Sequence, residues 1–267
     1  MGEFKNTVFT KVAHLLGEHP EIVPDIINMY RTNLSNQVAN FHKNTIAYRP
    51  LKGLKLHSES HWSHTDKGVM ILGLYEQEIL ESLSHIGPQY TNFIDLGAAD
   101  GYYGIGVLIN NLFRKSYCFE ITAKGQEVIK QNAILNNVLN KVVIKGEAKK
   151  DFYKDIHIDD IKNSVLLVDI EGGEFSLFDE NLFSVFKNSI IFIELHDWFF
   201  EDGESKIAKL KSDAINTHLI SELTTSERDL SKFNELKSLS DTERWLLCSE
   251  GRPRMMTWLR LDPISRI

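Results

Sequence analysis

The sequence predicts an α/β fold built around a doubly wound, mostly parallel sheet. Short runs rich in Val, Ile, Leu and Phe alternate with helical stretches between residues 92 and 195. Such nearly uninterrupted apolar strands are typical of a parallel sheet covered by helices on both faces. A turn with two glycines follows the first run, at the place where an open α/β sheet binds its ligand.

The N-terminal region, residues 1–70, is expected to form a helical cap. Within residues 7–42, apolar side chains recur at spacings of three and four, which indicates helix. The positions concerned are Val8, Val12, Leu15, Ile26, Tyr30, Leu34, Val38 and Phe41, with Pro20 and Pro24 punctuating the two runs. Residues 43–68 are less regular and are predicted to form strand and loop.

Residues 71–267 are expected to form the sheet domain. A helix is predicted from Leu72 to Leu83, stopped by Gly87 and Pro88. Strands are predicted at 92–97, 117–121, 141–146, 164–170 and 189–195, and helices at 101–115, at 121–135 and around Phe175, Phe178 and Leu182. The runs "RWLLCS" and "MMTWLRL" flank "EGRPR", which predicts a C-terminal hairpin and hence an antiparallel edge.

The composition is that of an ordinary globular protein, with 42% hydrophobic and 25% charged residues. A net charge of −7 disfavours a nucleic-acid partner, because phosphate backbones are anionic. Cys118 and Cys248 are the two cysteines, each within an apolar run, which favours a reducing compartment. Neither a signal pattern nor an 18-residue apolar stretch is present, so we expect a cytoplasmic protein without a membrane span.

The stretch "NFIDLGAADGYYG", residues 92–104, predicts the ligand. Gly97 permits a tight turn, and the helix that opens at Gly101 presents backbone N–H groups to an anionic group. Asp95 and Asp100 would repel a pyrophosphate but suit an ammonium group and ribose hydroxyls. A ligand with an amine, a carboxylate and a nucleoside is S-adenosylmethionine. The expected binding residues in this turn are Asp95, Gly97, Ala98, Asp100, Gly101 and Tyr102; the alternative is a plain strand–helix turn.

Acidic residues also end the next two strands. Glu120 lies 25 positions after Asp95 and is expected to accept hydrogen bonds from the ribose hydroxyls. Glu147 and Ala148 follow the third strand and are expected to meet the adenine.

These residues resemble a class I S-adenosylmethionine-dependent methyltransferase, and more narrowly the FkbM family. The resemblance covers about residues 72–200 and lies in "GLYEQEILESL", "IDLGAADGYYGIGVL", "LLVDIEGGEF" and "IIFIELHDW". It implies a Rossmann-like sheet of seven strands with the last one antiparallel. It also implies O-methylation of a carbohydrate or another small natural-product acceptor in a biosynthetic step, with the regions outside 72–200 selecting the acceptor.

The candidate catalytic residues end the fourth and fifth strands. Asp169 and Glu171 point the same way along an extended strand, as do Glu194 and His196, so each pair can face one pocket. His196 is the predicted general base, since a neutral imidazole accepts a proton near pH 7. Asp169 would orient the acceptor or touch the cofactor amine, whereas Glu171 and Glu194 could pair with a cation, bond a sugar, or serve only as caps or ion pairs. Glu174 is attributed to the helix dipole.

Several other sets of side chains can be interpreted in two ways, as functional or as structural residues. The carboxylates with one histidine also suit Mg²⁺ or Mn²⁺, although their spacing does not require a metal. His57, His61 and His64 in "LHSESHWSH" are predicted to lie in a loop near the acceptor rather than to bind metal. The aromatic and arginine side chains are either acceptor contacts or, more simply, core and surface residues: Trp62, Trp198, Phe199, Arg244, Arg252 and Arg254.

Four competing functions remain from the sequence. A base methyltransferase would carry an Asn/Asp-Pro-Pro-aromatic motif where this chain has "DIEGGEF". A nicotinamide-dependent oxidoreductase would carry a third glycine and no Asp100. A non-catalytic binding protein could carry the same glycine turn, and so could a methyltransferase that transfers to nitrogen. Assembly into an oligomer is also compatible with the sequence.

Overall fold

The computed structural model describes residues 14, 17–19, 22–252 and 254–264 of the chain. Val8, Val12, Leu15 and Pro20, which carry the first predicted helical run, lie outside the described residues. The second run forms α2 (Val23–Phe41), with Pro24 in its first turn as expected.

The sheet has seven strands in the order β3-β2-β1-β4-β5-β7-β6, and this confirms the predicted fold class. β1 to β5 pair in parallel, while β7 runs antiparallel to both β5 and β6. Their bounds are β1 Asn92–Leu96, β2 Lys115–Phe119, β3 Val142–Lys145, β4 Ser164–Val168, β5 Ile190–Glu194, β6 His218–Thr224 and β7 Thr257–Pro263. The order reverses between β1 and β4, so their carboxyl ends flank the expected ligand crevice.

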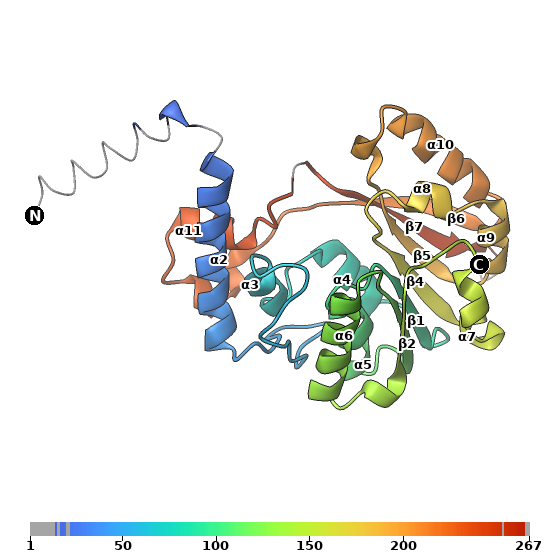
Figure 1. The fold of residues 1–267 in the computed structure, drawn as a ribbon, viewed down its shortest axis with the longest axis horizontal. Coiled ribbons are helices and arrows are strands. Elements are labelled where there is room, and N and C mark those ends of the chain that lie inside the picture. Colours follow the sequence, from blue (N-terminus) through green and yellow to red (C-terminus); the bar gives the residue numbers. More distant parts are fainter. Residues whose placement is uncertain (1–13, 15–16, 20–21, 253, 265–267) are drawn as a thin grey trace, which may run out of the picture.

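Helices cover the two faces of the sheet (Figure 1). One face carries α4 (Gln77–Ser84), α5 (Tyr102–Ile109) and α6 (Ala123–Leu135). The other carries α7 (Ile158–Lys162), α8 (Glu174–Leu177), α9 (Glu180–Val185) and α10 (Gly203–Ala214). Successive residues of β1 alternate between the two cores, since Phe93 packs on the first face and Ile94 on the second. The 3₁₀ turns are η2 Leu139–Lys141, η3 Phe152–Asp155, η4 Asp197–Phe199, η5 Leu230–Lys232 and η6 Asn234–Leu236.

The predicted C-terminal hairpin is wrong, although the antiparallel last strand is right. "RWLLCS" lies mostly in α11 (Asp241–Cys248), whose start is fixed by a reciprocal capping box between Ser240 and Glu243. β7 lies between β5 and β6, and β6 is an edge strand in which polar and apolar residues mix.

The single helix predicted from Leu72 to Leu83 is also wrong. The structure has α3 (Lys67–Ile71) and α4, with Gly73 and Glu76 at positive φ between them. A helix cannot pass through left-handed residues, so the chain turns there. Likewise, α5 ends at Ile109, six residues before the predicted end at 115.

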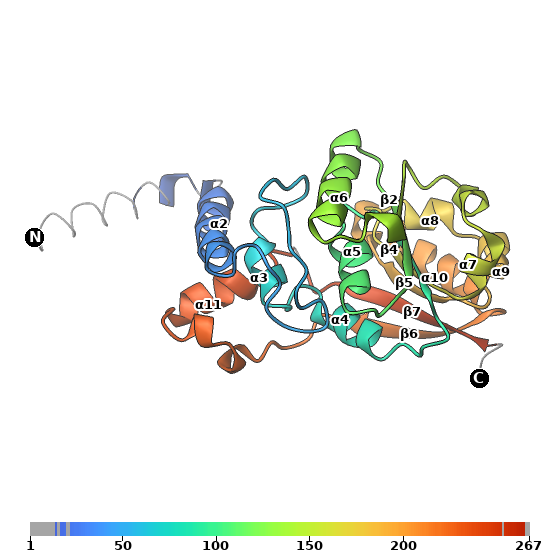
Figure 2. The same ribbon diagram turned by 90° about the horizontal axis from the view of Figure 1, so that it is seen from below.

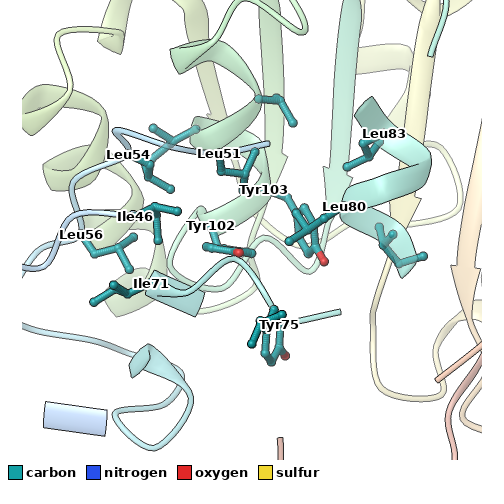
Figure 3. Close-up of a cluster of buried hydrophobic side chains, with 14 of the residues drawn as sticks. Ile46, Leu51, Leu54, Leu56, Ile71, Tyr75, Leu80, Leu83, Tyr102 and Tyr103 are labelled. Atoms are coloured by element: carbon teal, nitrogen blue, oxygen red, sulfur yellow. The ribbon is translucent and has the colours of Figure 1, made fainter. Parts of the chain in front are cut away.

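The cap is built from both ends of the chain. α2, α3 and α11 lie side by side at one end of the molecule in both views (Figures 1 and 2). Residues 46–56 connect this layer to α5, where Ile46, Leu51 and Leu54 pack around Tyr102 (Figure 3). A domain boundary at residue 70 stays a prediction, and α11 packs on α2 from the other side of it. Among the described helices, none has both the length and the apolar character needed to cross a membrane.

Candidate cofactor and catalytic site

The glycine turn after β1 brings two strands into close contact. Gly97 has a φ of 87°, and a Cβ there would overlap the backbone carbonyl oxygen of Asp169 at the end of β4. Only glycine avoids both the strain of a positive φ and the overlap of a Cβ with that oxygen. Asp95 is buried below the turn and accepts a 2.9 Å hydrogen bond from the Gly104 N–H in the first turn of α5. Burial raises the pKa of Asp95 to about 8, against the opposing effect of that N–H donor.

Glu120 holds a second turn at the end of β2. Its Oε2 accepts from the Ala99 N–H at 3.0 Å, and its Oε1 accepts from the Thr122 N–H at 2.8 Å and the Thr122 hydroxyl at 2.7 Å. A carboxylate offers about four lone-pair sites, so one site on Oε2 remains for a ligand. The carboxylate is therefore held in a defined orientation.

A cavity of about 800 Å³ opens along the carboxyl ends of the parallel strands. This size is within the usual range for small-molecule and cofactor sites. It is lined by most of the residues that the sequence assigns to cofactor binding, namely Asp95, Gly97, Ala98, Tyr102, Glu120, Glu147 and Ala148. Asp169 and Glu171 line its other end, so both predicted functions share one cavity.

Asp100 and Gly101 do not line this cavity. Asp100 instead anchors the loop that the sequence singled out for its histidines. It accepts from the Ser60 hydroxyl and, at 2.8 Å, from the His61 N–H. The contact of Asp100 with the cofactor stays a prediction. In the structure, its carboxylate binds the loop at Ser60 and His61.

The loop brings two of its own residues to the cavity. His61 and Trp62 line it beside Glu120, and His61 Nε2 is 2.9 Å from the Thr122 hydroxyl. The segment is a loop, as predicted, and its His57 and His64 belong to no metal-type group among the described residues.

The four predicted catalytic residues come together at the ends of β4 and β5. His196 Nε2 lies 3.7 Å from Asp169, 3.4 Å from Glu171 and 3.7 Å from Glu194. His196 is only 3% exposed and does not line the cavity, whereas Asp169 and Glu171 do. Its role as general base stays a prediction, and a proton would reach it through those carboxylates.

Glu174 does more than the helix-dipole role that the sequence suggested. It is fully buried, and its two oxygens accept from the Gly172 N–H and the His196 N–H, both at 2.9 Å. Glu174 thus ties the turn after β4 to the end of β5. In this turn Glu171 adopts a φ of 52°, a left-handed conformation that is costly for a residue with a side chain.

Sequence reasoning missed Glu76 and misjudged Arg252. Arg252 is not a solvated surface arginine: it donates to Glu194 at 2.5 Å, to Glu250 at 3.1 Å and to Glu76. Glu76 lines the cavity and also accepts from the Tyr103 hydroxyl at 2.7 Å. It stands within the quoted "GLYEQEIL", where the sequence alone does not distinguish it from Glu78 or Glu81; in the structure, Glu76 lines the cavity and the other two do not.

Burial and mutual repulsion dominate the electrostatics of this end. Burial, Asp169 and Glu76 raise the pKa of Glu194 to about 11, and Arg252 only partly opposes them. Burial likewise raises the pKa of Glu76 to about 7 despite Arg252. Burial alone would lower the pKa of His196, yet Glu174 and Asp169 together raise it. This group of buried carboxyl groups therefore favours a positively charged side chain or ligand beside it.

Comparisons with known proteins give similar folds only. No protein-family model matches the chain, and no curated protein matches it. Similar solved structures include an uncharacterized protein from Listeria monocytogenes serotype 4b, at 10% identity over 70% of this chain and 67% of that one, with a TM-score of 0.47. Another is the B. subtilis M1A22 tRNA methyltransferase TrmK, at 8% identity over 68% of this chain and 64% of that one, with a TM-score of 0.45. A further one is M. jannaschii TYW2 in complex with AdoMet, at 16% identity over 79% of this chain and 82% of that one, with a TM-score of 0.45.

Proposed function

We propose that this protein is an S-adenosylmethionine-dependent methyltransferase that acts on a hydroxyl of a carbohydrate or another small metabolite. One observation carries the proposal. A single cavity joins the glycine turn after β1 and the oriented carboxylate of Glu120 to the carboxylates of Asp169 and Glu171. This is the crevice in which open α/β sheets bind nucleotide-like ligands. Membership of the FkbM family is part of the proposal and rests on the motifs quoted above.

The residues fit the cofactor on chemical grounds. The free acceptor site of Glu120 suits a ribose hydroxyl, and the backbone from Gly97 to Ala99 is open to a ligand because its side chains are small or absent. Glu147 and Ala148 line the cavity after β3, where an adenine would lie. Asp95 and Glu76 supply acidic groups for the amine. When bound, S-adenosylmethionine supplies an activated methyl group.

The acceptor would lie at the Asp169 and Glu171 end of the cavity. These carboxylates accept hydrogen bonds from hydroxyl groups and can hold a sugar in position for transfer. Trp198 and Phe199 lie beside His196: the Phe199 ring stacks on the imidazole with ring centroids 5.7 Å apart, and Phe199 is half exposed. A hydroxyl acceptor is favoured because the cavity-lining groups on this side, Asp169 and Glu171, are hydrogen-bond acceptors.

Calorimetric titration with S-adenosylhomocysteine tests the cofactor half of the proposal. We expect saturable binding, no heat with NADH, and a loss of affinity of roughly tenfold or more in Glu120→Gln, which keeps the size but removes the charge. Glu127→Gln is the matched control, because Glu127 is an exposed acid on α6 outside the cavity. A folded protein that gives no heat with either the cofactor or its product would overturn the proposal.

The acceptor half is tested with methyl-labelled cofactor and a panel of hydroxylated acceptors. Label in a glycoside or hydroxylated metabolite supports transfer to oxygen. Label recovered only in amines or in tRNA would contradict that part, and cofactor binding without transfer to any acceptor class would favour a binding protein.

A further inference from the structure

The side chains at the ends of β4 and β5 form more than an acidic lining. Asp169, Glu171 and His196 each offer one ligand atom, and these atoms lie within 4.8 Å of one another. We propose that these three residues bind one divalent cation of the first transition row, with Mn²⁺ as the model ion. The binding stands apart from the proposed function; only the role of the ion in catalysis rests on it.

The distances suit ligands that share one ion. His196 Nε2 is 3.4 Å from the Glu171 oxygen and 3.7 Å from the Asp169 oxygen. For bonds of about 2.1–2.5 Å, neighbouring ligands of one ion stand roughly 3.0–3.6 Å apart. A small inward movement of the half-exposed Glu171 would complete the set. The Glu194 oxygen is also 3.7 Å from Nε2, but Glu194 is already paired with Arg252.

His196 is a buried polar group without a conventional partner. Its side chain is buried, with 3% of the residue exposed to solvent. Its Nδ1 has no hydrogen-bond partner among the described residues. Its Nε2 faces carboxylates at 3.4–3.7 Å, which is longer than an ordinary hydrogen bond. Asp169 Oδ1 is likewise buried and without a partner in the described part of the chain. Unpaired buried polar atoms are rare, and Asp169 Oδ1 lies 3.7 Å from His196 Nε2, so an ion between these two atoms would give both a partner.

The surroundings of His196 match those of a metal ligand. Glu174 Oε1 lies 3.4 Å from Nδ1, on the side opposite the cluster, so a carboxylate stands behind the imidazole. A carboxylate in this place is the common second partner of a metal-bound histidine, because it fixes the ring orientation. Glu174 is itself held by the N–H groups of Gly172 and His196. The ring is thus positioned to present Nε2.

Charge balance selects this set of ligands over its neighbour. Glu76, Asp169 and Glu194 form a second group with suitable distances, but Arg252 already binds Glu76 and Glu194. Within the described residues, no lysine or arginine nitrogen lies within 4.0 Å of Asp169 or Glu171. The uncompensated carboxylates are therefore the two beside Nε2. The imidazole nitrogen favours a first-row transition ion, and Mn²⁺ serves as the model ion because the other two ligands are carboxylate oxygens, which suit it.

On the proposed function, the ion would explain how the acceptor loses its proton. A hydroxyl bound to a divalent cation is more acidic, so its proton can pass to solvent water as the oxygen takes the methyl group, and a separate strong base is not required. His196 would then be a ligand rather than the general base that the sequence suggested. Asp169 and Glu171 line the cavity, so an ion held by them is open to an acceptor from that side.

Titration of the cofactor-free protein with MnCl₂, followed by the electron paramagnetic resonance signal of free Mn²⁺, tests the site. We expect one bound ion per chain. Asp169→Asn, His196→Ala and Glu171→Gln should each weaken binding by roughly 10–100-fold or more. His157→Ala is the matched control, because His157 and Asp159 form an exposed histidine–carboxylate pair 3.8 Å apart. Circular dichroism establishes that each variant is folded, and the half-exposed Glu171 provides a variant that does not disturb the core.

Two results would overturn the site. The first is no loss of free signal at millimolar Mn²⁺ with folded wild-type protein. The second is wild-type affinity in both His196→Ala and Glu171→Gln, which would place the ion elsewhere. The calorimetric titration with S-adenosylhomocysteine is independent of both, so failure of the metal site and failure of the methyltransferase proposal give different results.

Discussion

Gly97 and Asp169 are in contact through the backbone: a Cβ on residue 97 would overlap the carbonyl oxygen of Asp169. The turn expected to hold the cofactor and the strand end expected to hold the acceptor are therefore packed directly together. A side chain at residue 97 would push β1 away from β4 beside the cavity. The glycine therefore allows the cofactor turn and the acceptor end of the site to pack together.

Gly97→Ala should destabilise the protein by at least about 1–3 kcal/mol, because it combines a left-handed φ with a backbone overlap. Urea unfolding measures this. Gly146→Ala is the control, since a Cβ there meets nothing within 4 Å and φ is not in the left-handed range. Equal stability of the two variants would show that β1 and β4 are not packed as described.

Asp95→Asn should change how stability depends on pH. The native pKa of Asp95 is raised to about 8 from an ordinary 3.8, so the folded state keeps a proton that the unfolded state loses. Below pH 3.8 both states are protonated and Asp95 contributes nothing. Between about pH 4 and 8 the wild type therefore loses stability progressively, and above pH 8 the loss is complete.

The asparagine variant lacks this loss and can still accept the Gly104 N–H. Its free energy of unfolding relative to wild type should rise by an amount on the order of a few kcal/mol from pH 5 to pH 8. Chemical unfolding at both pH values measures the difference. A constant difference would mean that Asp95 is ionised in the folded protein, and Asp229→Asn, at an exposed turn, should show no such rise.

Arg252→Met should cost about 3–5 kcal/mol, because Glu76 and Glu194 would lose their buried cation. Thermal unfolding measures the loss. Adding Glu76→Gln should restore part of it, since one of the two carboxyl groups left without the guanidinium is then replaced by a neutral amide. Arg254→Met is the control, as Arg254 is half exposed and pairs with Asp197 only at 3.5 Å. Additive effects of Arg252→Met and Glu76→Gln would contradict the pairing.

Glu171→Gly and Glu171→Ala should separate backbone strain from carboxylate chemistry. Residue 171 has a φ of 52°, so the glycine variant should be more stable than the alanine variant by about 1–2 kcal/mol. Both lack the carboxylate, and both should lose Mn²⁺ affinity on the proposal above. Equal stability of the two variants in urea would show that the left-handed turn is relieved in solution.

Much of the parallel sheet could be predicted because its signals are local. Strands buried on both faces, such as "SVLLVDI", need continuous apolar residues, and the acids that end them share an edge in any parallel sheet. The edge strand β6 escaped prediction because "HLISELT" needs only one apolar face. "RWLLCS" was assigned to a strand because a short apolar run does not distinguish strand from helix, and the capping Ser240 outside the run decided for helix.

The sequence by itself determined the five parallel strands up to β5, the glycine turn, and the gathering of Asp169, Glu171, Glu194 and His196 at one edge. Only the tertiary structure decided that Arg252 reaches back 176 positions to Glu76, that Asp100 holds the loop at Ser60, and that His196 is buried. The physical reason is that strand pattern and turn conformation depend on neighbouring residues. Charge pairing and burial depend on which distant segments fold together.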